Sequence, residues 1–163
     1  MYGTSKIGFG GGCHWCTEAT FQALKGVTEV DQGWIASTPP AETFSEAVIV
    51  HYAPSQIPLR VLIEVHLRTH ASTRDHSLRS KYRSAVYCFD QAGLARAREI
   101  LAELAPQFDP PPVTVALPFK AFKSSPPHYQ DYYKTAPERP FCKTYIDPKL
   151  AKLRREFGEY AKA

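Results

Sequence analysis

The sequence predicts an α+β protein: a two-layer sandwich of the ferredoxin-like, split βαβ type, with an irregular C-terminal extension. Two observations lead to this prediction. The length of 163 residues suits one domain with a hydrophobic core of its own, so we treat residues 1–163 as a single domain. Up to residue 89, the apolar patterns follow the order strand, helix, strand, strand, helix, strand, in which helices cover one face of a mixed sheet.

The elements can be justified in chain order. Residues 7–9 form a short apolar stretch typical of a strand, and three glycines follow it. Helical spacing of apolar residues begins near Cys13 and ends at the Lys-Gly pair of residues 25–26, a helix-end signal. The other predicted strands are rich in β-branched and apolar residues. Pro58 suits the first turn of the second helix, and Asp90 suits the cap of the third. The remaining elements are strands at 27–35, 47–52, 84–89 and 113–117, helices at 59–70, 91–105 and 149–161, and an irregular stretch at 118–140.

Composition excludes several classes of protein. The chain has twenty basic and sixteen acidic residues, a net charge of +4. The basic residues are scattered along the sequence, so we expect no nucleic-acid partner. No apolar run approaches the roughly 18–20 residues of a membrane span, and the N-terminus lacks the pattern of a signal peptide. We therefore expect a cytoplasmic monomer whose four cysteines are reduced at rest.

The strongest chemical signal is Gly-Gly-Gly-Cys-His-Trp-Cys-Thr-Glu at residues 10–18. The glycines allow a sharp turn or a close approach to a ligand, and they place Cys13 in the first turn of a helix. Free backbone N–H groups and the helix dipole favour an anion there, which lowers the pKa of a thiol. The pattern predicts a reactive Cys13; a buried cysteine at a simple turn is the alternative.

The spacing of Cys13 and Cys16 is by itself compatible with three chemistries. Structural zinc needs further ligands at matching spacing, and Cys88 and Cys142 are isolated, so we predict no metal site. Haem attachment needs a histidine directly after the second cysteine, where this chain has Thr17. A redox dithiol remains, although the preceding glycines and the order of strands are unusual for a thioredoxin-like fold.

The same segment resembles the signature of class A peptide methionine sulfoxide reductases, Gly-Cys-Phe-Trp followed by Gly or Cys. Further stretches resemble that family in the same order: Ser-Glu-Ala-Val at 45–48, Lys-Tyr-Arg-Ser-Ala-Val-Tyr at 81–87, and a C-terminal block with Gln-Asp-Tyr-Tyr at 130–133, Pro-Phe-Cys at 140–142 and Pro-Lys-Leu at 148–150. The resemblance covers about residues 6–155. It implies one reductase domain that reduces the S epimer of protein-bound or free methionine sulfoxide and needs no bound cofactor.

The resemblance also implies catalytic roles. Cys13 attacks the sulfoxide sulfur as a thiolate and becomes a sulfenic acid. Glu46 supplies a proton to the sulfoxide oxygen, and Tyr82 donates a hydrogen bond to the same oxygen. A strand glutamate on the surface and a tyrosine in the core are the alternatives for these two residues.

The substrate pocket is expected to consist of aromatic rings. Trp15 forms the wall that takes the methyl group, and Trp34 or His14 completes it. Both of these differ from the family pattern, which has a phenylalanine at His14 and a tyrosine at Trp34. Ser77 stands where the family has an aspartate, and Asp75 lies two residues away. These departures leave substrate preference open.

A second thiol must then remove the sulfenic acid, giving a disulfide that thioredoxin, the expected partner, can reduce. Cys16 lies one helical turn from Cys13, and Cys142 lies on a stretch that looks mobile. We expect Cys16 to act first and Cys142 to take over the disulfide. Cys88 falls within an apolar strand and is predicted to be a core residue.

Two other functions stay open at this point. A general thiol–disulfide oxidoreductase would use Cys13 and Cys16 without Glu46 or an aromatic pocket. A non-catalytic redox-sensing relative would explain the changes at His14, Trp34 and Ser77.

Overall fold

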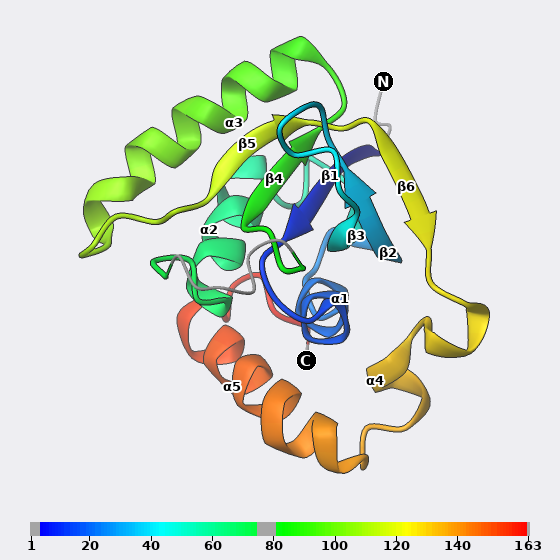
Figure 1. Cartoon of the computed structure of the whole chain (residues 1–163). Coiled ribbons are helices and arrows are strands. Elements are labelled where there is room, and N and C mark those ends of the chain that lie inside the picture. Colours follow the sequence, from blue (N-terminus) through cyan, green and yellow to red (C-terminus); the bar gives the residue numbers. More distant parts are fainter. Residues whose placement is uncertain (1–3, 75–80, 163) are drawn as a thin grey trace.

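The computed structural model describes residues 4–74 and 81–162, and Figure 1 shows a twisted sheet with its helices around it. The six strands lie in the order β5-β4-β1-β3-β2-β6. Strands β4 and β5 are parallel, and the other neighbouring pairs are antiparallel. The bounds are β1 Ser5–Gly10, β2 Val27–Ala36, β3 Ser45–Tyr52, β4 Ala85–Cys88, β5 Val115–Pro118 and β6 Ala121–Ser124. The predicted combination of a mixed sheet with packed helices is confirmed.

The main core lies between one face of the sheet and the long helices. Phe9 of β1 is fully buried there, and its ring stacks on Phe21 of α1 with centroids 4.6 Å apart. The Asp90 side chain accepts the N–H of Gly93 at 2.6 Å, which confirms the predicted cap. The helices are α1 His14–Gln22, α2 Leu59–Thr69, α3 Gln91–Leu104, α4 Tyr132–Thr135 and α5 Asp147–Glu156, with the short turns η1 Ala105–Gln107, η2 Pro127–Tyr129 and η3 Cys142–Ile146.

A smaller apolar cluster covers the opposite face of the sheet, around Ile35 and Tyr87. Side chains alternate between the two faces along a strand. Residues on β2 and β3 therefore face either the helices or this second cluster. Within residues 4–74 and 81–162, none of the helices has both the length and the apolar character that a membrane span needs.

The C-terminal third differs from the sequence prediction. Part of the stretch predicted as irregular forms β6, which pairs with the end of β2. Gly33 makes this pairing possible, because a Cβ atom there would lie 2.1 Å from the Lys123 carbonyl oxygen. The last helix begins at Asp147 rather than 149 and ends at Glu156. The chain then returns to pair Ala161 with Leu24 in an isolated bridge.

Two of the expected site differences, at Ser77 and Asp75, lie outside the described residues.

Candidate active site

Cys13 is the N-cap residue of α1, one position before the predicted first turn. Its carbonyl oxygen accepts the N–H groups of Cys16 and Thr17 at 3.1 and 3.2 Å. The preceding turn requires glycine at position 11, because a Cβ atom there would lie 2.5 Å from the ring of His70. This turn delivers a half-buried Cys13 to the start of the helix.

A hydrogen bond between two thiols sets the ionisation of Cys13. The Cys16 thiol donates to the Cys13 sulfur, and this is the main cause that lowers the pKa of Cys13. The backbone N–H groups of Trp15 and Cys16 act in the same direction, while burial and the charge of Glu46 oppose them. The pKa of Cys16 is raised, chiefly because its thiol donates that hydrogen bond and also because it is buried. The pair therefore favours a thiolate at Cys13 and a protonated thiol at Cys16.

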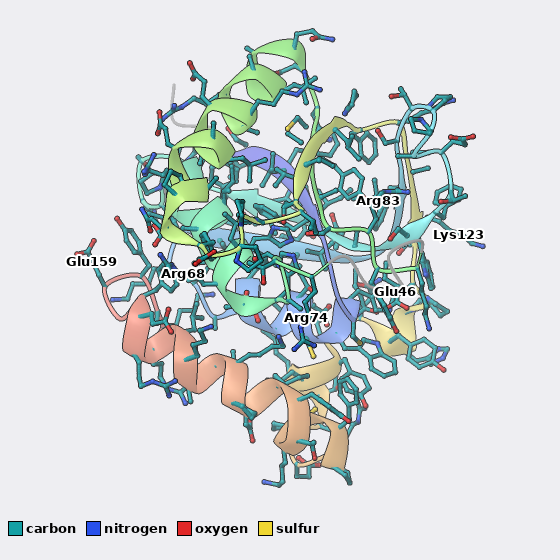
Figure 2. The ribbon with its side chains drawn as sticks, turned by 60° about the vertical axis from the view of Figure 1, so that its left-hand side comes forward. Glu46, Arg68, Arg74, Arg83, Lys123 and Glu159 are labelled. Atoms are coloured by element: carbon teal, nitrogen blue, oxygen red, sulfur yellow. The ribbon has the colours of Figure 1, made fainter. Side chains whose placement is uncertain are left out.

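Glu46, labelled in Figure 2, is the second residue of β3 and only 8% exposed. Its Oε1 accepts the backbone N–H of His14 at 3.2 Å, so the carboxylate binds the first residue of α1. Its Oε2 lies 3.7 Å from Lys81 Nζ. The structure thus places Glu46, the predicted acid, at the start of α1, the helix whose N-cap is Cys13.

Tyr82 lies in the loop before β4 and is half-buried. Lys81 Nζ lies 5.1 Å from the centroid of its ring. A hydrogen bond with Tyr82 is the main cause that raises the pKa of Lys81, and the charge of Glu46 adds to it. Tyr82 is therefore linked to Glu46 through Lys81, and its bond to a sulfoxide oxygen stays a prediction.

Trp15 lies within a group of aromatic rings from the C-terminal part of the chain. Its indole stacks on Tyr132 with centroids 4.1 Å apart and an interplanar angle of 2°. Phe141 meets it edge-on at 5.4 Å. One face of the ring predicted to bind the substrate methyl group is thus covered by Tyr132.

The other two predicted pocket residues lie on the side of Glu46. Trp34 and Glu46 are Cα partners across β2 and β3. The His14 ring meets Trp34 at 5.2 Å between centroids, and His14 Nδ1 is 2.8 Å from the Gly33 carbonyl oxygen. His14 is 7% exposed, so it lies beneath the site rather than on its rim.

Cys142 differs from the expectation of a mobile, irregular stretch. It begins the turn η3, and its side chain is 0% exposed. It belongs to the same apolar cluster as Cys16, with Cys13 packed against that cluster. Burial also raises the pKa of Cys88 to about 11, and Cys88 lies in the main core.

Glu18 of α1 holds the C-terminal part of the chain against this helix, a role that its place near the start of the helix does not reveal. Its carboxylate is 0% exposed and accepts the backbone N–H groups of Asp131 and Tyr132 at 2.8 and 3.1 Å. Gln32 donates to it as well, at 2.9 Å. Burial raises the pKa of Glu18. An acidic residue on an apolar helical face was the available signal.

A small cavity of about 50 Å³ lies behind the two thiols and is lined by Cys13, Cys16 and Lys149 among others. Burial lowers the pKa of Lys149, whose amine donates to the Thr69 carbonyl oxygen. A larger cavity of about 430 Å³ runs along β2 and contains none of the predicted site residues. The larger cavity is therefore not the place of the thiol chemistry.

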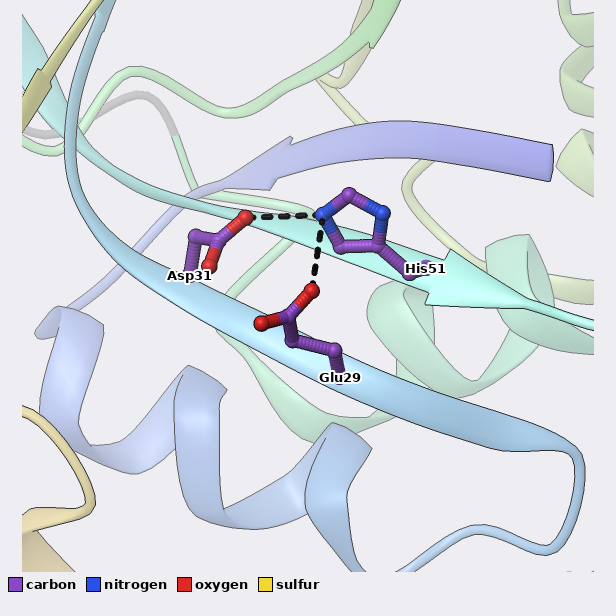
Figure 3. Close-up of side chains that lie close together, drawn as sticks. All are labelled: Glu29, Asp31 and His51. Carbon is purple, nitrogen blue, oxygen red and sulfur yellow. Dashed lines mark hydrogen bonds and ion pairs between the residues drawn. The ribbon is translucent and has the colours of Figure 1, made fainter. Parts of the chain in front are cut away.

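One group of side chains could hold a cation. Glu29 and Asp31 of β2 and His51 of β3 bring their ligand atoms within 4.8 Å of one another (Figure 3). His51 Nε2 lies 2.7 Å from Asp31 Oδ2 and 3.8 Å from Glu29 Oε2. By strand alternation His51 faces the side of the sheet opposite to Glu46. Ordinary ion pairs account for this geometry.

Cys13 stands at the start of α1, beside the sheet, and shares a hydrogen bond with Cys16. This arrangement defines an oxidoreductase that works with thiol chemistry. A model of the family "Peptide methionine sulfoxide reductase" matches residues 5–161. The chain belongs to this family of enzymes, which are oxidoreductases acting on sulfur.

Individual relatives agree with this assignment. The peptide methionine sulfoxide reductase MsrA of Deinococcus radiodurans is 35% identical, over 93% of this chain and 81% of its own. Among solved structures, methionine sulfoxide reductase A of Corynebacterium diphtheriae is 25% identical with a TM-score of 0.71, covering 83% of this chain and 76% of its own. Mxr1 of Saccharomyces cerevisiae in complex with Trx2 is 25% identical with a TM-score of 0.63, covering 80% and 85%.

Proposed function

We propose that the chain reduces the S epimer of methionine sulfoxide, protein-bound or free, through a sulfenic acid on Cys13. The observation that carries this proposal is the pair of thiols at the start of α1 with a buried carboxylate beside it. The pKa of Cys13 is lowered, and Glu46 binds the adjoining backbone N–H at 3.2 Å. Membership of the reductase family supports the substrate class.

The reductive step needs one nucleophile and one proton. The Cys13 thiolate and a proton convert the sulfoxide to the thioether, and the oxygen ends as a hydroxyl on the Cys13 sulfur. The substrate sulfur gains two electrons and Cys13 loses two. Glu46 delivers the proton to the oxygen as it gains negative charge, and Tyr82 donates a hydrogen bond to it. Trp15, with Trp34 or His14, holds the methyl group.

Recycling uses the remaining thiols of the site. The Cys16 thiol attacks the sulfenic acid, forming the Cys13–Cys16 disulfide and releasing water. Cys142 then attacks the Cys16 sulfur, which frees Cys13 and leaves a Cys16–Cys142 disulfide. Thioredoxin reduces this disulfide by exchange. The contact of Mxr1 with Trx2 supports the partner, and the shared cluster of Cys16 and Cys142 supports the order.

The proposal includes the setting of the enzyme. The strand order β4-β1-β3-β2 supports a ferredoxin-like core extended by β5 and β6. We assign residues 1–163 to one domain that acts as a monomer without a bound cofactor. A cytoplasmic location suits thiols that must be reduced at rest.

The test is thioredoxin-coupled turnover on each epimer of a blocked methionine sulfoxide. We expect turnover of the S epimer alone, because each class of reductase handles one epimer. Cys13→Ser should abolish reduction while the circular dichroism spectrum stays native, since serine is similar in size but a far weaker nucleophile. Cys88→Ser is the matched control and should stay active.

Other outcomes would support the competing functions. Reduction of a small disulfide without either sulfoxide would indicate a general thiol–disulfide oxidoreductase. Ready oxidation of Cys13 without sulfoxide turnover, whatever the reductant, would indicate a redox sensor. Substantial turnover by a folded Cys13→Ser protein would show that the nucleophile is assigned wrongly.

A further inference from the structure

His14 has a fixed tautomer next to Glu46. Its Nδ1 lies 2.8 Å from the Gly33 carbonyl oxygen, and a carbonyl oxygen only accepts, so Nδ1 carries a hydrogen in either charge state. Nε2 is then the atom that gains or loses a proton. This nitrogen lies 3.7 Å from Glu46 Oε1. The imidazole is 7% exposed, so few water molecules can compete for that proton.

Glu46 needs a nearby source of a proton, because its contacts favour the ionised carboxylate. Its Oε1 accepts a backbone N–H at 3.2 Å, and its Oε2 lies 3.7 Å from the Lys81 ammonium. Both contacts stabilise a negative carboxylate, and glutamate carboxyl groups are ordinarily ionised at neutral pH. A carboxylate has no proton to deliver. Histidine is the side chain that ordinarily exchanges its proton near neutrality.

We propose that His14 is the proton reserve of Glu46, which makes it a positioning residue that acts through the acid. At rest the imidazolium holds the proton on Nε2 beside an ionised Glu46. During reduction this proton passes to Glu46 and on to the sulfoxide oxygen, which ends as the hydroxyl of the Cys13 sulfenic acid. His14 is left neutral, with its hydrogen on Nδ1, and takes a new proton from water. This inference rests on the proposed function and gives His14 a role there other than holding the methyl group.

Other charged groups near the pair cannot replace His14. Lys81 faces Glu46 from the loop before β4 with a side chain that is 61% exposed, and Tyr82 lies next to it. Lys123 of β6 lies over the ring of Trp34, with Nζ 6.0 Å from the centroid. Cys13 adjoins His14 on the chain. Lysine and tyrosine ordinarily titrate near pH 10, above the neutral range.

The experiment measures single-turnover reduction of methionine sulfoxide between about pH 5 and 8.5, which isolates the step before recycling. His14→Phe removes the reserve. His14→Asn is the matched variant, because its amide can still donate to the Gly33 carbonyl oxygen but cannot carry the proton. The alkylation rate of Cys13 in each variant, measured at each pH, corrects for the thiolate fraction.

We expect both variants to lose more than about tenfold of the corrected rate at pH 7 and progressively less toward pH 5, where the solvent supplies protons at a higher concentration. A loss equal at every pH would indicate a structural role and overturn the proposal. Rates within twofold of wild type throughout would overturn it as well. Lys81→Met removes one of the two contacts that stabilise the carboxylate but leaves the reserve in place, so its corrected rate at pH 7 should be at least that of the wild type.

A second readout does not depend on activity. Nuclear magnetic resonance of the wild-type protein should show the His14 ring gaining a proton between about pH 5 and 8, and Glu46→Gln should move that transition. A ring that stays neutral over this range would overturn the proposal even if the variants fail to fold. Failure of the proposed function is distinct, because the wild type would then not reduce the sulfoxide at all.

Discussion

In the proposed mechanism, the hydrogen bond between Cys16 and Cys13 determines which sulfur attacks the substrate. Cys16 donates it, so the pKa of Cys13 is lowered and the pKa of Cys16 is raised. The attacking sulfur is therefore ready at rest. The resolving sulfur keeps its proton until Cys13 has been oxidised and no longer accepts the hydrogen bond.

The pH dependence of alkylation tests this view of Cys13. Iodoacetamide reacts with thiolates. The alkylation rate of Cys13, followed by mass spectrometry, should therefore reach half its maximum at a pH below the pKa of an ordinary thiol. Cys16→Ala removes the donor and should move this midpoint up by about one to two pH units, given the usual strength of a charge-assisted hydrogen bond. Cys16→Ser keeps a donor and should move it less. An unchanged or lower midpoint in Cys16→Ala would contradict this account.

At the scale of elements, α1 and the C-terminal segment of residues 130–146 form one unit. The buried Glu18 binds two backbone N–H groups of that segment. Tyr132 of the segment stacks on Trp15, and Cys142 packs with Cys16. This packing places Cys142, the proposed recycling cysteine, against the helix whose N-cap is Cys13.

The relay of thiols can be tested by separating the two phases. Single-turnover reduction should survive in Cys16→Ser and in Cys142→Ser, because the first step needs only Cys13. Continuous turnover with thioredoxin should fall in both variants. Disulfide mapping after one equivalent of substrate should find the Cys13–Cys16 bond first. If Cys142→Ser recycles at the wild-type rate, the C-terminal cysteine takes no part.

The elements that could be predicted from the sequence are those with local signals. Strands β2 and β3 follow from their β-branched residues, and Asp90 marks the start of α3. Strand β6 has no such signal, since its four residues are held as a strand by pairing across Gly33. For the site, the glycine turn and the spacing of the cysteines indicated Cys13. The backbone N–H of Asp131 donates to the Glu18 carboxylate, and the two residues are 113 positions apart in the sequence. No local pattern reveals such a contact.

One hydrophobic core connects the sheet to α1 and α2. Phe9 shows this most directly. It lies on the strand that leads into the glycine turn, it is fully buried, and its ring also meets that of His66 on α2 at 4.8 Å. A loss of packing at this position therefore acts on the sheet and on two helices together.

Phe9→Ala should lower the free energy of unfolding by about 3–5 kcal/mol, the usual cost of removing a buried phenylalanine side chain. The proposed single domain predicts one urea transition, with fluorescence and circular dichroism coinciding. Phe44, which is 48% exposed, supplies the control: Phe44→Ala should change stability by no more than about 0.5 kcal/mol. Two separate transitions in the wild type would contradict the single domain.

Tyr132 and Cys142 lie on the same C-terminal segment of residues 130–146, and this affects the kinetics expected of the enzyme. The segment that covers Trp15 also holds a cysteine that is 0% exposed. On the proposed relay, the protein reductant gains access to that cysteine only when the segment moves away, and this movement also uncovers the indole proposed to bind the substrate methyl group. The substrate oxidises the thiols and the reductant reduces the disulfide, so each acts on the form of the enzyme that the other leaves behind. Such an enzyme follows ping-pong kinetics, in which double-reciprocal plots recorded at different concentrations of reductant are parallel lines.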